Sequence, residues 1–210
     1  PHLLDRKNAA IEECRVVDVR RVPNYSAGHI PNAISLDLSS LEHSSGDVVD
    51  VRSLFDSLSI RPLTQVVVYD EIGGPDAAWL WWKLVEAGHP YVSVLDGGWE
   101  CWVADGFPVT THVPELSTGG YRPEGEERKR PVDGGIREVE WDWTRVRGPS
   151  GLKSAEKMQN SLLQMGIRPG ERLRLPNSSA REAAVLVLVL RLLGEEANLV
   201  MDSEGAPLVQ

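Results

Sequence analysis

The feature that most constrains the fold of this chain is an internal repeat with a spacing of 106 residues. A pair of alanines, a glycine and an aspartate recur at this spacing, and shorter Gly-containing and Ile-Arg-Pro stretches recur at the same or the next offset. The matched positions are Ala77 and Ala183, Ala78 and Ala184, Gly88 and Gly194, Asp96 and Asp202, residues 28–30 and 134–136, and residues 60–62 and 167–169. Agreement at one offset over such a span indicates a duplicated structural unit. We therefore expect two copies of one fold.

The second copy lacks part of the pattern. The first copy opens with a valine-rich segment, CRVVDVR at residues 14–20, which is typical of a strand. Its counterpart near residues 120–126 reads GYRPEGE, which is typical of a loop. Either the second copy has lost its opening strand, or residues are missing from the chain between Gly119 and Asp133. We predict a truncated second copy.

The remaining patterns predict strands that alternate with helices in both copies. In the first copy we expect strands at residues 15–19, 34–36, 66–69 and 92–95, and helices at residues 3–13, 51–58, 77–87 and 98–105. In the second copy we expect strands at residues 137–141, 173–175 and 198–201, and helices at residues 155–165 and 181–193.

This alternation predicts an α/β fold with two domains, each a mostly parallel sheet flanked by helices on both faces. We place the first domain at residues 1–111, a linker rich in Gly, Pro and charge at residues 112–133, and the incomplete second domain at residues 134–210. Parallel sheets of this kind bind ligands where strands end and helices begin. The loops at residues 70–76 and 176–182 occupy that position.

Composition excludes several classes of function. The net charge of −9 and the acidic surroundings of the one basic cluster, Arg128–Arg130, argue against direct binding of nucleic acid. The longest apolar stretch, residues 183–193, is too short to span a membrane and predicts a buried helix. Cys14 and Cys101 form neither a disulfide framework nor a metal-binding pair, so we expect a reducing compartment, no metal and no cofactor.

The first copy resembles the rhodanese superfamily, and specifically its tandem thiosulfate and mercaptopyruvate sulfurtransferases. The resemblance rests on VDVR at residues 17–20, YSAGHIPNA at 25–33, VVYD at 67–70, AAWLWW at 77–82 and VLDGGW at 94–99 followed by Trp102. The second copy resembles the same family more weakly, through GLKS at residues 151–154, MGIRP at 165–169 and residues 183–194.

The resemblance implies a catalytic cysteine directly after the central strand of the second domain. There, backbone N–H groups and a helix N-terminus lower the pKa of the thiol, and its thiolate accepts a sulfur atom. That position falls here on Pro176 or Asn177, and the first copy has Asp70 in its place. A carboxylate or an amide cannot carry a persulfide. The chain also has Trp79 where tandem members often have Arg.

Other residues are interpreted structurally. We expect Cys101 and Cys14 to be packed thiols, His29 to hydrogen-bond within its Gly-His-Ile turn, and Asp18 and Arg20 to form a structural pair beside the first loop. Three residues of the second loop are candidates for a residual anion site, with helix capping as the alternative for its serines: Ser178, Ser179 and Arg181. Most tryptophans are expected in the core, with one or two at an interface: Trp79, Trp81, Trp82, Trp99, Trp102, Trp141 and Trp143.

We therefore expect a degenerate, catalytically inactive member of this family that binds other protein subunits, since a sheet without its opening strand exposes an edge and apolar surface. The alternatives are an active sulfurtransferase, whose cysteine is Cys101 or lies elsewhere, and a non-catalytic sensor of small anions. The family resemblance implies a mitochondrial location. The alternative is a cytoplasmic one.

Overall fold

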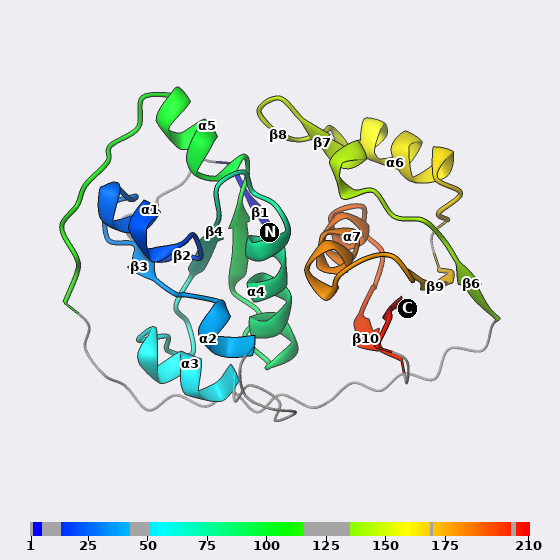
Figure 1. The fold of residues 1–210 in the computed structure, drawn as a ribbon, viewed down its shortest axis with the longest axis horizontal. Coiled ribbons are helices and arrows are strands. Elements are labelled where there is room, and N and C mark those ends of the chain that lie inside the picture. The colour runs from blue at the N-terminus through cyan, green and yellow to red at the C-terminus, as the bar shows by residue number, and fades with distance from the viewer. Residues whose placement is uncertain (1, 6–13, 43–50, 116–134, 169, 203–204) are drawn as a thin grey trace.

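The computed structural model describes residues 2–5, 14–42, 51–115, 135–168, 170–202 and 205–210, which form two sheets with helices packed on and between them (Figure 1). The first sheet is entirely parallel and has the strand order β1-β5-β4-β2-β3. Its strands are β1 (Leu3–Leu4), β2 (Arg15–Asp18), β3 (Ile34–Ser35), β4 (Val66–Tyr69) and β5 (Val92–Leu95).

Both faces of the first sheet are buried, as the sequence predicts. Val66 and Val68 of β4 face one hydrophobic core, and Val67 and Tyr69 face another on the opposite side. Side chains alternate between the two faces of a strand, so an apolar run without polar interruptions requires cover on both sides. That cover comes from α1 (Val22–Ala27), α2 (Ser39–Glu42), α3 (Val51–Ser57), α4 (Pro75–Glu86) and α5 (Gly98–Ala104).

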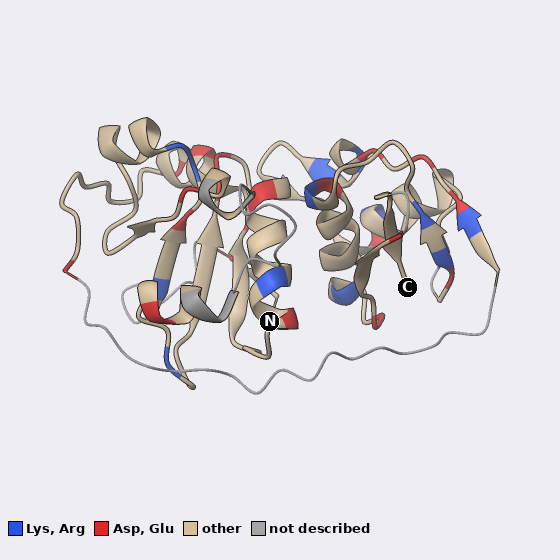
Figure 2. Cartoon of the chain, turned by 60° about the horizontal axis from the view of Figure 1, so that its bottom comes forward, with Lys and Arg blue, Asp and Glu red and all other residues tan. Residues whose placement is uncertain are grey.

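The second sheet is mixed, with the strand order β10-β11-β9-β6. Here β6 and β9 are parallel, whereas β11 runs antiparallel between β9 and β10. The strands are β6 (Ile136–Glu138), β9 (Arg172–Arg174), β10 (Leu199–Met201) and β11 (Pro207–Val209); the other elements of this half are the 3₁₀ turn η2 (Trp143–Val146), the hairpin β7 (Arg147–Gly148) and β8 (Gly151–Leu152), and the helices α6 (Ala155–Gln164) and α7 (Ala180–Leu192). Figure 2 shows basic and acidic residues together on β6 and β9, and Arg174 pairs there with Glu138 and Asp202.

Helices α4 and α7 pack against each other at the centre of the molecule (Figure 1). Every residue of α7 from 183 to 190 is buried, because one side of the helix contacts α4 and another contacts the second sheet. The predicted buried helix is thus confirmed. Buried side chains of the two halves form one continuous hydrophobic core.

Two expectations differ from the structure, and a third concerns residues outside its described part. Leu3 and Leu4 belong to a strand rather than a helix, because β1 pairs with Val94 and Leu95 of β5; residues 6–13 lie outside the described part of the chain. Strand β11 was not expected, and it places an antiparallel strand between β9 and β10, whereas β4 and β5 pair directly. The proposed counterpart of the opening strand, residues 120–126, and most of the predicted linker lie outside the described residues.

A buried histidine gives the fold a predictable response to acid. His89 is fully buried, and burial lowers its pKa even though Nε2 contacts the carbonyl oxygen of Thr64 at 2.9 Å. A folded-state pKa below the unfolded value of about 6.5 means that the unfolded chain binds more protons, so stability falls as the pH drops below 7. We expect this loss, at most about 1.4 kcal/mol per pH unit for one group, to be smaller in His89→Gln. Urea unfolding of both proteins from pH 7 to pH 5 measures it, with the exposed His112→Gln as control; equal slopes in wild type and His89→Gln would contradict it.

No helix among the described residues has both the length and the apolar character needed to cross a membrane.

Candidate functional site

The loop after β4 is organised around the carboxylate of Asp70. This side chain is buried, and its two oxygens accept hydrogen bonds from the backbone N–H groups of Ile72 at 3.0 Å, Gly74 at 2.9 and 3.1 Å, and Ala77 at 3.1 Å. Ala77 lies in the first turn of α4, where N–H groups have no partner within the helix. The loop therefore surrounds an oxyanion that belongs to the chain itself.

Two opposing effects act on the Asp70 carboxyl. Burial raises its pKa above the usual range, and the three N–H donors oppose that rise by favouring the charged form. The loop packs too tightly for added atoms. A Cβ on Gly98 would clash with the backbone of Gly73 and of Asp70 itself.

The corresponding loop of the second half is arranged differently. Pro176 and Asn177 lie exposed in a turn after β9. Ser179 caps α7: its hydroxyl accepts from the N–H of Glu182 at 3.2 Å, and the Glu182 carboxylate accepts from the N–H of Ser179 at 2.8 Å. The carboxylate of Glu182 thus lies at the start of the helix, where an external anion would bind.

The three anion-site candidates have partners of their own within the chain. Ser179 is occupied by the capping box, and Arg181 pairs with Asp76 at the start of α4. Ser178 is partly exposed and donates its N–H to the carbonyl of Leu175 at 3.2 Å. The anion site remains a prediction, although helix capping already accounts for Ser179.

The structural pair Asp18 and Arg20 is confirmed. Both side chains are buried, the Arg20 guanidinium donates to Asp18 at 2.7 Å, and it also donates to the carbonyl of Gly28 at 2.8 Å. The hydroxyl of Tyr69 donates to the same carboxylate at 2.5 Å. The Arg20 guanidinium lies 4.0 Å from the centre of the Trp99 ring. This network ties β2 to β4 beside the first loop.

The remaining candidates occupy structural positions. The ring nitrogens of His29 contact the carbonyl oxygens of Tyr25 at 2.9 Å and His112 at 3.1 Å, so this side chain holds its turn together. Cys101 is buried in α5, and Cys14 is partly buried. Five of the seven tryptophans are buried and two partly so; the buried ones are Trp79, Trp81, Trp82, Trp102 and Trp141.

The β7–β8 hairpin of the second half packs on the first half where β5 ends, a contact that no pattern in the chain predicts. The Asp96 carboxylate at the end of β5 accepts a hydrogen bond from the N–H of Leu152 at 2.8 Å. Gly151 allows the approach, because a Cβ at this position would clash with Asp96. Trp143 lies against Gly74. The hairpin therefore packs against the end of β5, and Trp143 of η2 contacts the Asp70 loop.

We expect Asp96→Ala to loosen the contact between the hairpin and the end of β5. Leu152 would lose the acceptor of its N–H, at a cost of about 1 kcal/mol, and its amide should exchange faster with solvent. Hydrogen exchange measured by NMR at residues 147–152 tests this, with the exposed Asp105→Ala as control. Unchanged exchange in the hairpin would show that Asp96 does not hold it.

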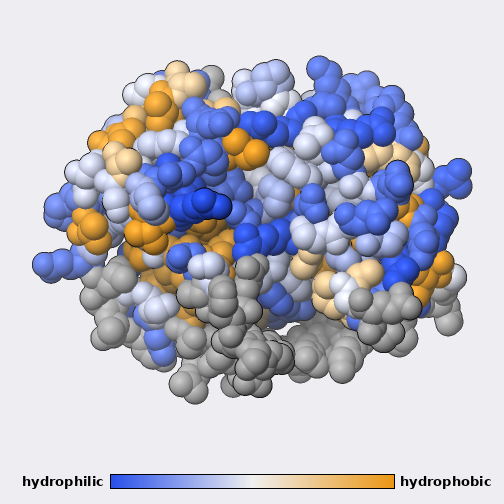
Figure 3. All heavy atoms as spheres, viewed as in Figure 1, coloured by the Kyte–Doolittle hydropathy of each residue, from blue (hydrophilic) through white to orange (hydrophobic). Residues whose placement is uncertain are grey.

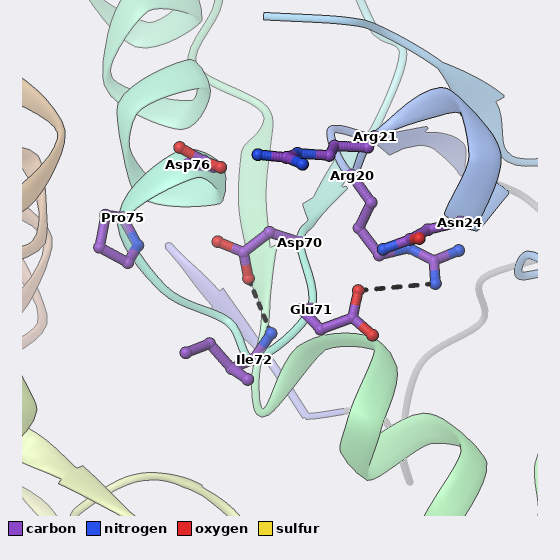
Figure 4. Close-up of a pocket in the computed structure, with 8 residues that line it drawn as sticks. All are labelled: Arg20, Arg21, Asn24, Asp70, Glu71, Ile72, Pro75 and Asp76. Carbon is purple, nitrogen blue, oxygen red and sulfur yellow. Dashed lines mark hydrogen bonds and ion pairs between the residues drawn. The ribbon is translucent and has the colours of Figure 1, made fainter.

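An open pocket of about 370 Å³ lies beside the first loop (Figure 4). The residues around it come from the segments after β2 and β4: Arg20, Arg21, Asn24, Asp70, Glu71, Ile72, Pro75 and Asp76. Guanidinium and carboxylate groups thus line the same cavity. Within the described parts of the chain, no three His, Cys, Asp or Glu side chains gather closely enough to hold a metal ion.

Comparison with known proteins matches residues 3–105 to the rhodanese-like domain. A thiosulfate sulfurtransferase of Pseudomonas aeruginosa is 32% identical over 118 residues, which cover 53% of this chain and 43% of that protein. The chain thus matches less than half the length of this relative.

Two solved structures share the fold over most of both chains. SseA of Escherichia coli, a 3-mercaptopyruvate sulfotransferase, superposes with a TM-score of 0.78 at 19% identity and covers 92% of this chain and 95% of its own. The sub-stoichiometric sulfur transferase subunit of yeast mitochondrial complex I has a TM-score of 0.68 at 17% identity, covering 93% and 91%. The sequence comparisons thus show that residues 3–105 belong to the rhodanese-like domain family, and the solved structures show that the chain as a whole shares the sulfurtransferase fold.

Proposed function

We propose that this chain does not transfer sulfur and instead serves as a protein-binding subunit with a rhodanese-like fold. The observation that carries the proposal is the chemistry of the two loops. Asp70 follows β4, and Pro176 and Asn177 follow β9, so neither loop presents a thiol at the position where the family resemblance puts the nucleophile. Sulfur transfer through a persulfide needs a thiolate there.

The surroundings of both positions support the same proposal. In the first loop three N–H donors bind the Asp70 carboxylate, and in the second the Glu182 carboxylate caps the helix. These N–H groups are therefore engaged by side chains of the chain itself. The two thiols lie elsewhere, with Cys101 buried in α5 and Cys14 next to β2.

The second half offers surface for a partner. Strand β6 is exposed at the edge of its sheet, and Ile136, Val200 and Met201 are exposed apolar side chains on the two outer strands. Figure 3 shows apolar side chains at the surface among mostly hydrophilic ones. Exposed edges and apolar side chains favour association with another protein. The likeness to a complex I subunit supports a role within an assembly, and we propose a mitochondrial location on the same ground.

The test is a sulfur-transfer assay of the purified chain. Thiosulfate and mercaptopyruvate serve as donors and cyanide as acceptor, with the Escherichia coli enzyme as positive control. We expect no turnover above the uncatalysed rate for the wild type, Cys101→Ser or Cys14→Ser. Turnover that one of these substitutions abolishes would overturn the proposal and identify that cysteine as the sulfur carrier.

A further inference from the structure

The pocket beside the first loop has a cationic group that no other part of the described structure uses. Arg21 is exposed at the start of α1, and its guanidinium makes no hydrogen bond or ion pair with any described residue. Asn24 lines the same side of the pocket, and its amide is likewise without a described partner. Arg20, by contrast, donates hydrogen bonds to Asp18 and Gly28 and pairs with Glu71.

The other side of the pocket carries acidic groups. Glu71 and Asp76 each have one partner, Arg20 at 3.8 Å and Arg181 respectively, and both side chains are partly exposed. A carboxylate has about four acceptor sites, so a single partner leaves room for further donors. Arg21 forms no ion pair with either of them although all three line one cavity (Figure 4). The pocket therefore presents separated positive and negative charges.

We propose that this pocket binds a small zwitterion with the chemistry of a free α-amino acid. The ligand carboxylate would accept hydrogen bonds from Arg21 and Asn24, and its ammonium group would donate to Glu71 and Asp76. Ile72 and Pro75 supply apolar surface for a small side chain. A simple anion would be repelled by the two carboxylates, and a simple cation would be repelled by Arg21. Neither ion alone complements both kinds of charge in the pocket. This inference goes beyond the proposed protein-binding role and does not depend on it.

The volume of the pocket fits such a ligand. Pockets for small molecules span about 300–1,000 Å³, and about 370 Å³ lies at the small end of that range. Its position at the carboxyl end of β2 and β4 is where open α/β sheets hold their ligands.

Titration of the ¹⁵N-labelled full chain with L-alanine, followed by ¹H–¹⁵N NMR, tests the proposal. We expect saturable chemical-shift changes for the amides of residues 21–24 and 71–76. Acetate and methylammonium should each bind at least about tenfold more weakly than alanine. Arg21→Gln should weaken alanine binding by about tenfold or more, and Glu71→Gln should weaken it measurably. The matched control is Arg61→Gln, because Arg61 is exposed and does not line the pocket.

Three results would overturn the zwitterion site. The first is the absence of saturable shifts at millimolar alanine. The second is acetate binding as tight as that of alanine with no effect of Glu71→Gln, which would make the pocket a plain anion site. The third is an equal loss of binding in Arg61→Gln and Arg21→Gln, which would show nonspecific charge attraction.

Discussion

Replacing Asp70 with alanine is expected to lower the free energy of unfolding by about 3–5 kcal/mol, since each buried donor left without a partner costs about 1–3 kcal/mol. The substitution removes the acceptor of three N–H groups, those of Ile72, Gly74 and Ala77. Asp70→Asn should cost less than Asp70→Ala, because the amide keeps one acceptor oxygen. It should still destabilise the loop, because its NH₂ group would face a backbone N–H donor.

Urea unfolding measures these differences, with the exposed Asp105→Ala as control. The explanation also predicts chemical rescue. Added formate can place a carboxylate among the three orphaned donors, so it should raise the unfolding midpoint of Asp70→Ala and leave that of the wild type unchanged. A loss below about 1 kcal/mol, the typical value of a single hydrogen bond, would mean that the carboxylate does not hold the loop.

The second large effect is expected for Arg20→Met, which should destabilise the fold by about 3–5 kcal/mol because it leaves the Asp18 carboxylate buried without its counter-charge. The methionine keeps most of the apolar stem but loses the bonds to Asp18 and Gly28 and the contact with the Trp99 ring. Tyr69 alone would remain as a side-chain donor to the carboxylate.

A double-mutant cycle separates this cost from the value of the pair. Asp18→Leu combined with Arg20→Met should be less destabilising than the sum of the two single variants, because no buried charge then lacks a partner. Additive losses would show that the two residues act independently. The exposed Arg61→Met is the control for loss of an arginine.

The local sequence pattern predicted the strands and helices whose own residues carry a clear apolar periodicity. It did not predict those that form only through pairing with distant strands. The apolar run at residues 66–69 predicts a strand covered on both faces, and β4 has these bounds. Leu3 and Leu4 carry no comparable signal, since their strand exists only through pairing with β5. Strand β11 likewise exists through its pairing with β9 on one side and β10 on the other.

The site was predictable in position and less so in chemistry. Sequence alone placed Asp70 and Asn177 in loops after central strands, and the repeat aligned them. It attached little meaning to Asp70, because the groups that bind its carboxylate are backbone N–H donors that any sequence possesses. The contact between Asp96 and the β7–β8 hairpin joins residues far apart in the chain, and no local pattern encodes it.

The packing of α4 on α7 has a consequence for the life of the chain in a cell. Arg181 and Arg191 of α7 lie 5.8 and 5.5 Å from the ring centres of Trp79 and Trp81 on α4. A first half made or left without the second would show these rings to water, a surface that chaperones and proteases recognise in unfinished proteins. Partial products that contain only the first half should therefore be cleared rather than accumulate.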